Sequence, residues 1–251
     1  MDFINGYALS ILEWVLVAVA AFMVGFSKTG IGGVAMLAIP ILAGIFGGKE
    51  STGILLPMLI AGDIFAIAYY HRHAEWSKII RVLPWTFAGL ALGIAVGNLI
   101  NDKQFIMLIA ILVLICLGML IYMEKKGSDL KLPEGAWFYI AVGIVAGFAS
   151  MIGNAAGPIF TIYLLSMGFR KNDFIGTSAW FFFIINMTKL PMQVFFWHNI
   201  TLRTAVIAVC LIPIIAAGAF LGVAVVKKIN EKIFRYIILV MTALTAIKLF
   251  F

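Results

Sequence analysis

Gly25-Phe26-Ser27-Lys28-Thr29-Gly30-Ile31-Gly32-Gly33 is a small, polar, glycine-dense stretch that separates two long apolar runs. A second stretch of this kind, from Gly147 to Pro158, separates two later runs and also opens with Gly-Phe. We call these stretches the first and second glycine-rich motifs. Each precedes a short hydrophobic segment and is therefore expected to place the N-terminus of a helix beside a loop. The free N–H groups and the positive dipole end of such a terminus favour anions.

The composition around the two motifs is that of an integral membrane protein. Hydrophobic residues make up 64% of the 251 residues and charged residues only 12%, whereas soluble domains average roughly 25% charged residues. The longest polar stretch runs from Glu124 to Gly135. It is much shorter than the roughly 50 residues that a separate soluble domain needs, so we expect an all-α membrane protein.

Ten apolar segments follow one another along the chain, and most reach the roughly 17–25 residues that a spanning helix requires. They are Ile11–Phe26, Ile31–Phe46, Ile54–Tyr70, Val82–Ile100, Phe105–Met123, Ala136–Ile152, Ala155–Met167, Phe174–Trp197, Ala205–Val226 and Ile233–Phe251. Ala155–Met167 is too short to cross a hydrocarbon core about 30 Å thick. It is therefore either a half-helix that enters from one face or a span completed by its flanks.

The second half of the chain repeats features of the first half in the same order. The pattern Pro-x4-Gly-x3-Gly begins at Pro84 and again at Pro213, and Asp63 occupies the position that corresponds to Asn186. We therefore expect a first repeat at 1–123, a cytoplasmic linker at 124–135 and a second repeat at 136–251. Five segments per repeat is an odd number, so the two repeats should be inverted, with broken or short helices at the motifs. Inverted repeats of this kind are typical of secondary transporters.

The positive charges indicate membrane orientation and no nucleic-acid partner. The net charge is +7, but Lys and Arg lie in short loops and gather on one side of the predicted topology. Because such residues stay in the cytoplasm, both termini are expected outside a cell (inner) membrane. The expected partners are a small anionic substrate, the lipid bilayer and possible further copies of the chain. No cofactor is expected, and His71 and His73 fit a cytoplasmic loop better than a metal site.

Both motifs and the paired Pro-x4-Gly-x3-Gly patterns resemble the TauE/SafE family of membrane transporters. The resemblance covers essentially the whole chain. Membership would imply a transporter, and not an enzyme, that moves sulfur-containing anions such as sulfite or sulfoacetate, commonly outward. The family is broad, so the resemblance leaves the substrate open.

The motifs supply most of the candidate substrate-binding residues, since glycine lets backbone N–H groups approach a ligand and hydroxyl groups can donate to sulfonate oxygens. These residues are Ser27, Lys28, Thr29, Gly30, Gly32 and Gly33 in the first motif, and Ser150, Gly153, Asn154 and Gly157 in the second. Two alternatives stay open. Lys28 is also explained as a lysine at the membrane surface, and Ser150 and Asn154 as helix caps.

Three polar residues inside apolar segments complete the candidates: Asn186 and Lys189 for substrate binding and Asp63 for coupling. A lysine near a helix centre usually faces a cavity or a partner, although Lys189 could instead extend to the membrane surface. Asp63 could pair with Lys189, in which case neutralising both residues should restore folding that is lost on neutralising Asp63 alone. It could otherwise carry a coupling proton.

Two other classes of function compete with a transporter that works by alternating access. An anion channel, or a permease for another small organic anion, would use the same residues without coupling. A membrane-embedded enzyme would need catalytic groups at membrane depth, and only Asp63 and Lys189 qualify, with no metal-ligand set. The chain lacks a Gly-x4-Gly-Lys-[Ser/Thr] motif, which disfavours ATP-driven transport by this chain alone.

Overall fold

The computed structural model describes residues 9–30, 32, 34–101, 103–105, 107, 108, 111, 135–230, 233, 236 and 240. Its regular elements within these residues are all helical, and six helices are long and apolar enough to cross a membrane. These are α1 (Ile11–Thr29), α3 (Gly48–Tyr70), α4 (Trp76–Leu99), α6 (Ala136–Gly153), α8 (Lys171–Met192) and α9 (Leu202–Lys228). The shorter elements are η2 (Val34–Leu37), α2 (Ala38–Phe46), η3 (His71–His73), α7 (Gly157–Ser166) and η5, a π-helical turn (Gln193–Trp197).

The expected all-α membrane fold is confirmed. The helices follow the apolar segments of the sequence, and α2 and α7 are too short to span a bilayer alone. The segments Phe105–Met123 and Ile233–Phe251 and the linker 124–135 lie largely outside the described residues.

The first break is shorter than the motif predicts. α1 continues as far as Thr29, so Ser27 and Lys28 belong to its last turn and not to a loop. α1 begins in a capping box, in which the Ser10 side chain and Glu13 satisfy each other's free backbone N–H groups.

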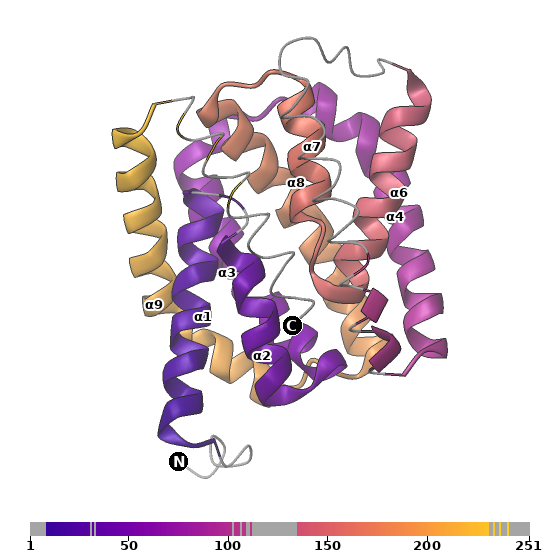
Figure 1. Cartoon of the computed structure of the whole chain (residues 1–251), viewed down its shortest axis with the longest axis vertical. Coiled ribbons are helices and arrows are strands. Elements are labelled where there is room, and N and C mark those ends of the chain that lie inside the picture. The colour runs from indigo at the N-terminus through magenta and orange to yellow at the C-terminus, as the bar shows by residue number, and fades with distance from the viewer. Residues whose placement is uncertain are drawn as a thin grey trace.

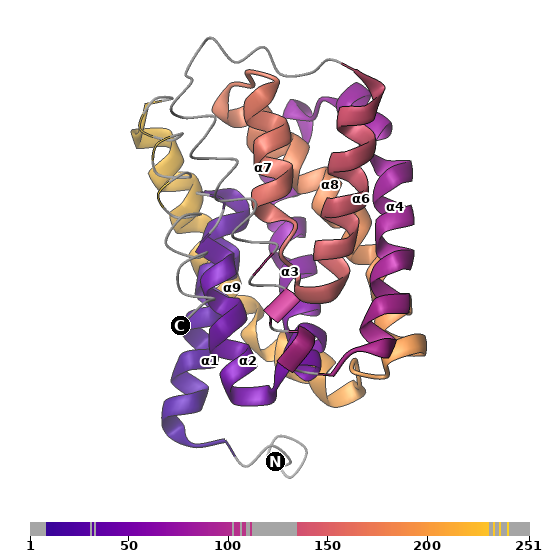
Figure 2. The ribbon, with the colours of Figure 1, turned by 45° about the vertical axis from the view of Figure 1, so that its right-hand side comes forward.

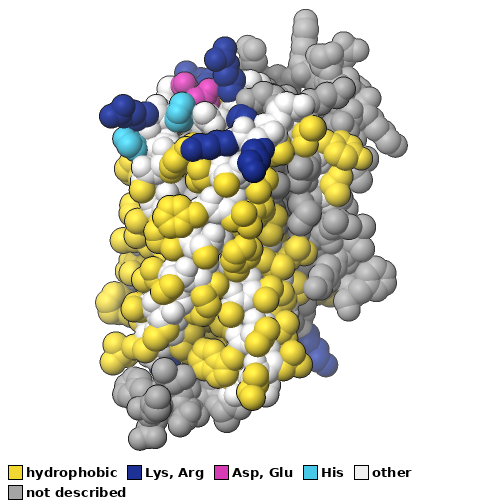
Figure 3. Space-filling model, turned by 90° about the vertical axis from the view of Figure 1, so that its left-hand side faces the viewer, with side chains coloured by type: hydrophobic (Ala, Val, Ile, Leu, Met, Phe, Trp, Pro, Cys, Tyr) yellow, Lys and Arg dark blue, Asp and Glu magenta, His cyan; other side chains and the backbone are white. Residues whose placement is uncertain are grey.

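The outside of the bundle is apolar, as a protein in lipid requires. Figure 3 shows hydrophobic side chains along most of one face, with Lys, Arg and His side chains gathered at one end. His71 and Arg72 lie at the end of the bundle where α8 starts, because η3 packs against α8. We call this end of the bundle the basic end.

The helices pack across the two halves of the chain. α1 lies along α9, and α4 lies along α6 (Figures 1 and 2). Glycines permit both contacts, because a Cβ on Gly25 would overlap with the carbonyl of Ile215, and a Cβ on Gly147 would overlap with that of Thr86. Small residues of this kind let helix backbones approach closely in membranes. Each half therefore completes its packing on a helix of the other half.

The same glycines make a clear prediction about stability. Gly218→Leu and Gly89→Leu should each lower the free energy of unfolding by about 1–3 kcal/mol or more, because overpacking forces the backbones apart. A Cβ at these positions would meet the carbonyls of Phe22 and Ile144, respectively. Unfolding in mixed detergent micelles measures the effect.

Gly44→Leu in α2 is the matched control, because a Cβ at Gly44 meets no atom within 4 Å. Equal stability of the Gly44, Gly89 and Gly218 variants would contradict the packing shown here.

α3 and α8 lie against each other between the two outer pairs and carry the charged residues of the interior. α3 is the most buried of the long helices. Both helices contain polar residues with no access to solvent, among them Asp63 and Lys189. Polar side chains at membrane depth are costly unless they are paired or functional. A functional site is therefore expected near the contact between α3 and α8.

Candidate functional site

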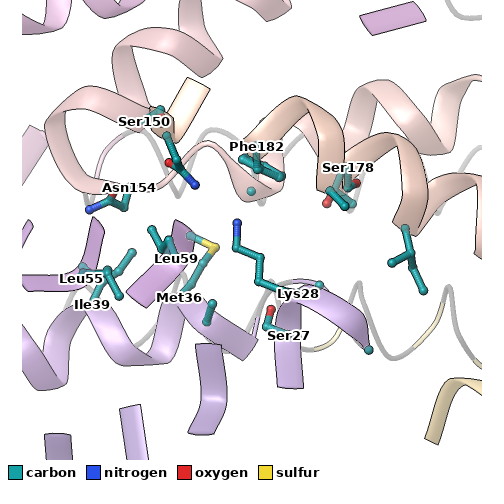
Figure 4. A pocket seen from close by; sticks show the side chains of 18 of the residues that line it. Ser27, Lys28, Met36, Ile39, Leu55, Leu59, Ser150, Asn154, Ser178 and Phe182 are labelled. Carbon is teal, nitrogen blue, oxygen red and sulfur yellow. The ribbon is translucent and has the colours of Figure 1, made fainter. Parts of the chain in front are cut away.

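A cavity of about 90 Å³ lies where the two glycine-rich motifs meet α3 and α8. Figure 4 shows Ser27 and Lys28 on one side and Ser150 and Phe182 on the other, with the Lys28 side chain extending between them. The lining residues are Ser27, Lys28, Gly30, Gly32, Ala35, Met36, Ile39, Leu55, Leu59, Ser150, Asn154, Gly157, Thr161, Phe174, Ile175, Ser178, Ala179, Phe182 and Asn186. The two motifs, more than a hundred residues apart in sequence, thus share one cavity.

An ion pair closes one side of the cavity. The Lys28 Nζ lies 2.7 Å from Asp63 Oδ1, and the two side chains are 11% and 0% exposed. The last turn of α1 carries Lys28, and the middle of α3 carries Asp63. Burial removes water from both charges, so each depends on the other for stabilisation.

A chain of hydrogen bonds extends this ion pair to a second lysine. Asn186 donates from Nδ2 to Asp63 Oδ2 at 2.7 Å, and its own Oδ1 accepts from Lys189 Nζ at 3.4 Å. Asn186 and Lys189 lie on one face of α8, three residues apart. A single amide therefore connects the carboxylate to the second ammonium group.

Lys189 is fully buried, and among the described residues its ammonium group donates to neutral oxygens. It donates to Ser150 Oγ at 3.1 Å and to Asn154 Oδ1, as well as to Asn186. Both Ser150 and Asn154 belong to the second motif. The cluster therefore holds two lysines, Lys28 in direct contact with the Asp63 carboxylate and Lys189 connected to it through Asn186.

The end of α6 aims an amide group at the cavity. Asn154 is the C-cap of α6 in the left-handed conformation (φ 55°), which Asn adopts more readily than most residues. Its Oδ1 accepts from Lys189, while its Nδ2 is buried and has no hydrogen-bond partner among the described residues. An unpartnered buried donor at a cavity wall is suited to an acceptor oxygen of a ligand.

The remaining wall is apolar and aromatic. Met36, Ile39 and Leu59 line one side, and the Lys28 Nζ lies 4.5 Å from the centre of the Phe182 ring. This cation–π contact supports the ammonium group without neutralising it. Few polar groups among apolar side chains are typical of small-molecule sites.

The structure brings most of the sequence-predicted residues together. Those that line the cavity are Ser27, Lys28, Gly30, Gly32, Ser150, Asn154, Gly157 and Asn186. Asp63 contacts two of them and Lys189 contacts three. Thr29 instead faces α9, where its hydroxyl donates to the Ala219 carbonyl at 2.6 Å. Gly153 is buried outside the lining, and Gly33 lies outside the described residues.

Of the alternatives left open for Asp63, pairing with a lysine agrees with the structure, but the partner is Lys28, and the carboxylate reaches Lys189 through Asn186. The sequence alone could not decide which lysine pairs with Asp63, because α1, which carries Lys28, and α8, which carries Lys189, both pack against α3. Sequence analysis also missed Ser178 and Phe182, two lining residues on α8. They share a face of the helix with Asn186, so helical spacing from that residue could have found them.

The described residues contain no cluster of three or more His, Cys, Asp or Glu side chains that could hold a metal ion.

Among known proteins, the family model described as Sulfite exporter TauE/SafE matches residues 17–249. No curated protein and no solved structure matches the chain.

Proposed function

Because the chain belongs to the TauE/SafE family of membrane transporters, we propose that it is a secondary transporter that exports a small sulfur-containing anion. Sulfite, sulfoacetate and related organosulfonates are the substrate class. The observation that carries this proposal is the cavity between the two motifs, where two lysines lie around a single carboxylate, Lys28 paired with it and Lys189 one amide away, and the Asn154 amide donor has no partner among the described residues. Sulfite and sulfonate groups offer the negative charge and the acceptor oxygens that these groups require.

The size of the cavity supports a small substrate. About 90 Å³ gives room for a few water molecules or a small anion. The apolar wall formed by Met36 and Leu59 would accommodate the carbon atoms of an organosulfonate beside its charged head. Binding by Lys28, Lys189 and the Asn154 amide would replace the water that the anion leaves behind.

Asp63 is the candidate for coupling, and we assign it the binding of a proton. In the ionised form its carboxylate holds Lys28 through the 2.7 Å ion pair. Protonation removes that negative charge and frees Lys28 for the anion, so proton and anion are expected to cross together. A divalent anion such as sulfite or sulfoacetate that crosses with one proton carries a net charge of −1, and the membrane potential, negative inside, drives that charge outward, at about 2.3 kcal/mol per charge per 100 mV.

Two features support alternating access by inverted halves. α1 begins at the lower end of the molecule in Figure 1, whereas α6 begins at the upper end. The glycine contacts also correspond, because Gly25 meets Ile215 as Gly147 meets Thr86, and these are matching positions of the two repeats. A pair of equivalent, oppositely directed contacts on either side of a central site is what a rocking mechanism uses. We place the basic end in the cytoplasm, which puts the start of α1 at the outer face of the inner membrane and agrees with the expectation that both termini are outside.

Efflux from proteoliposomes loaded with labelled sulfite or sulfoacetate tests the proposal. We expect efflux that saturates with anion concentration and speeds up when the lumen is more acidic than the outside. Asp63→Asn should keep efflux but lose its dependence on the pH gradient, since the amide imitates the protonated carboxyl. Efflux that is not saturable and is insensitive to the gradient would identify a channel instead.

Thermal stability of the purified protein gives an independent readout, because a ligand that binds only the folded state raises the melting temperature. Sulfite should raise it and chloride at the same ionic strength should not. Failure of every sulfur anion both to move and to stabilise the protein would refute the assignment of substrate class.

A further inference from the structure

A polar stripe continues along α8 beyond the cavity. Asn186, Lys189 and Gln193 are spaced three and four residues apart, so they lie on one face of the helix. Their side chains are 2%, 0% and 0% exposed. At 1.5 Å per residue, the stripe runs about 10 Å from Asn186, which lines the cavity, toward the end of the bundle opposite the basic end.

Gln193 is the member of this stripe without a function so far. Both its Nε2 and its Oε1 are buried and lack a hydrogen-bond partner among the described residues. An amide that is fully shielded and unpartnered on both atoms is costly to keep. Gln193 also opens the π-helical turn that ends α8, and such turns frequently mark functional sites.

Further polar groups follow in the same direction. Trp197 closes the π-helical turn, and its Nε1 is buried without a partner among the described residues. Lys49 lies over the Trp197 ring at 5.3 Å, and Asn199 donates to the Lys49 carbonyl at 2.8 Å while its Oδ1 is unpartnered. Hydrogen-bond donors and a cation thus lie between Gln193 and the far end of the bundle.

We propose that Gln193 binds the anion transiently during transport, after the anion leaves Lys189 and before it reaches Trp197 and Lys49. The inference rests on the proposed function and adds the path that the anion takes after it leaves the cavity. The amide N–H of Gln193 would donate to an anion oxygen during transit, and the indole N–H of Trp197 would donate next. Neither residue contacts the anion while it occupies the cavity, because neither lines it.

Gln193→Leu tests this, since leucine removes the amide and keeps much of the volume. We expect the maximal rate of sulfite efflux to fall at least tenfold, while stabilisation of the protein by sulfite stays at the wild-type value. The melting temperature should be unchanged or raised, because an unpartnered amide has been replaced by an apolar side chain. Wild-type efflux in this variant would overturn the proposal, and so would a lowered melting temperature combined with normal efflux per folded protein.

Gln104→Leu is the matched control. Gln104 is the other glutamine of the chain, is exposed, and accepts from the Asn101 backbone N–H at 3.0 Å. This variant should transport at the wild-type rate. If the wild-type protein itself neither moves nor binds sulfite, the proposed function fails, whereas a normal wild-type protein with a normal Gln193→Leu variant refutes the route alone.

A second measurement does not depend on transport rates. In a background with Cys116 and Cys210 replaced by serine, Gln193→Cys should react with a membrane-impermeant methanethiosulfonate that carries a sulfonate group. The reaction should be faster than with a cationic reagent of similar size, and Lys49→Met should slow it. Equal rates with both reagents, or no reaction from either side of the membrane, would contradict a route for anions past this position.

Discussion

Lys28→Met is expected to lower the free energy of unfolding by about 3–5 kcal/mol, because it leaves the Asp63 carboxylate buried without its cation. Asp63 is 0% exposed, and Lys28 is its ion-pair partner at 2.7 Å. Anion efflux should be lost as well. Unfolding in mixed micelles and efflux per folded protein measure the two effects separately.

The double variant Lys28→Met/Asp63→Asn separates stability from transport. Removing both charges removes the penalty of an unpaired buried ion, so the unfolding free energy should recover to within about 1–2 kcal/mol of wild type. Transport should not recover, because one of the two cations at the cavity is still missing. Lys228→Met, at an exposed position at the end of α9, is the control and should change neither quantity. A double variant as unstable as Lys28→Met would show that the ion pair is not what stabilises this region.

Lys189→Met is expected to change the stability of the protein little and its affinity for sulfite strongly, unlike Lys28→Met. Within the described part of the chain its ammonium group donates to Ser150, Asn154 and Asn186, so replacing it removes a buried charge that has no ion-pair partner there. The unfolding free energy should stay within about 1 kcal/mol of wild type. The apparent affinity for sulfite should fall about 10–150-fold, the equivalent of one charge-assisted hydrogen bond worth about 1.5–3 kcal/mol.

Sulfite-dependent thermal stabilisation of Lys189→Met gives the affinity, and unfolding without ligand gives the stability. Ser150→Ala, which removes one of the oxygens that position the ammonium group, should produce a smaller loss in the same direction. Strong destabilisation of Lys189→Met combined with unchanged sulfite affinity would show that Lys189 only holds α6 to α8.

The sequence predicts the membrane fold and singles out the motif residues that line the cavity, because both depend on local patterns. Apolar runs longer than a bilayer is thick predict helices such as α4 and α9, and the structure contains them. Both glycine-rich motifs were predicted to supply substrate-binding residues, and Ser27 of the first motif and Ser150 of the second both line one cavity. Glycine and small polar residues at an interruption of an apolar run are rare enough to be informative.

Pairing across the bundle could not be predicted in the same way. Thr29 belongs to the first motif, but the direction of the last turn of α1 takes its hydroxyl to α9. Lys28 and Lys189 are equally plausible partners of Asp63 until the crossing of α1 and α3 is known. Such outcomes depend on the rotation of each helix about its axis, which packing at glycines such as Gly25 determines.

The exchange of partners between the halves also bears on how the chain is assembled. α1 packs on α9 and α4 packs on α6, so after synthesis of the N-terminal half the glycine-lined faces of α1 and α4 still lack the helices that they contact in the described part of the folded chain. Its helices can insert into the bilayer early, but they reach their final arrangement only after α9, near the C-terminus, has been made. If the chain were cut in the linker, the two fragments would therefore have to be synthesised together. Each fragment would reach its folded arrangement only by packing its helices against those of the other.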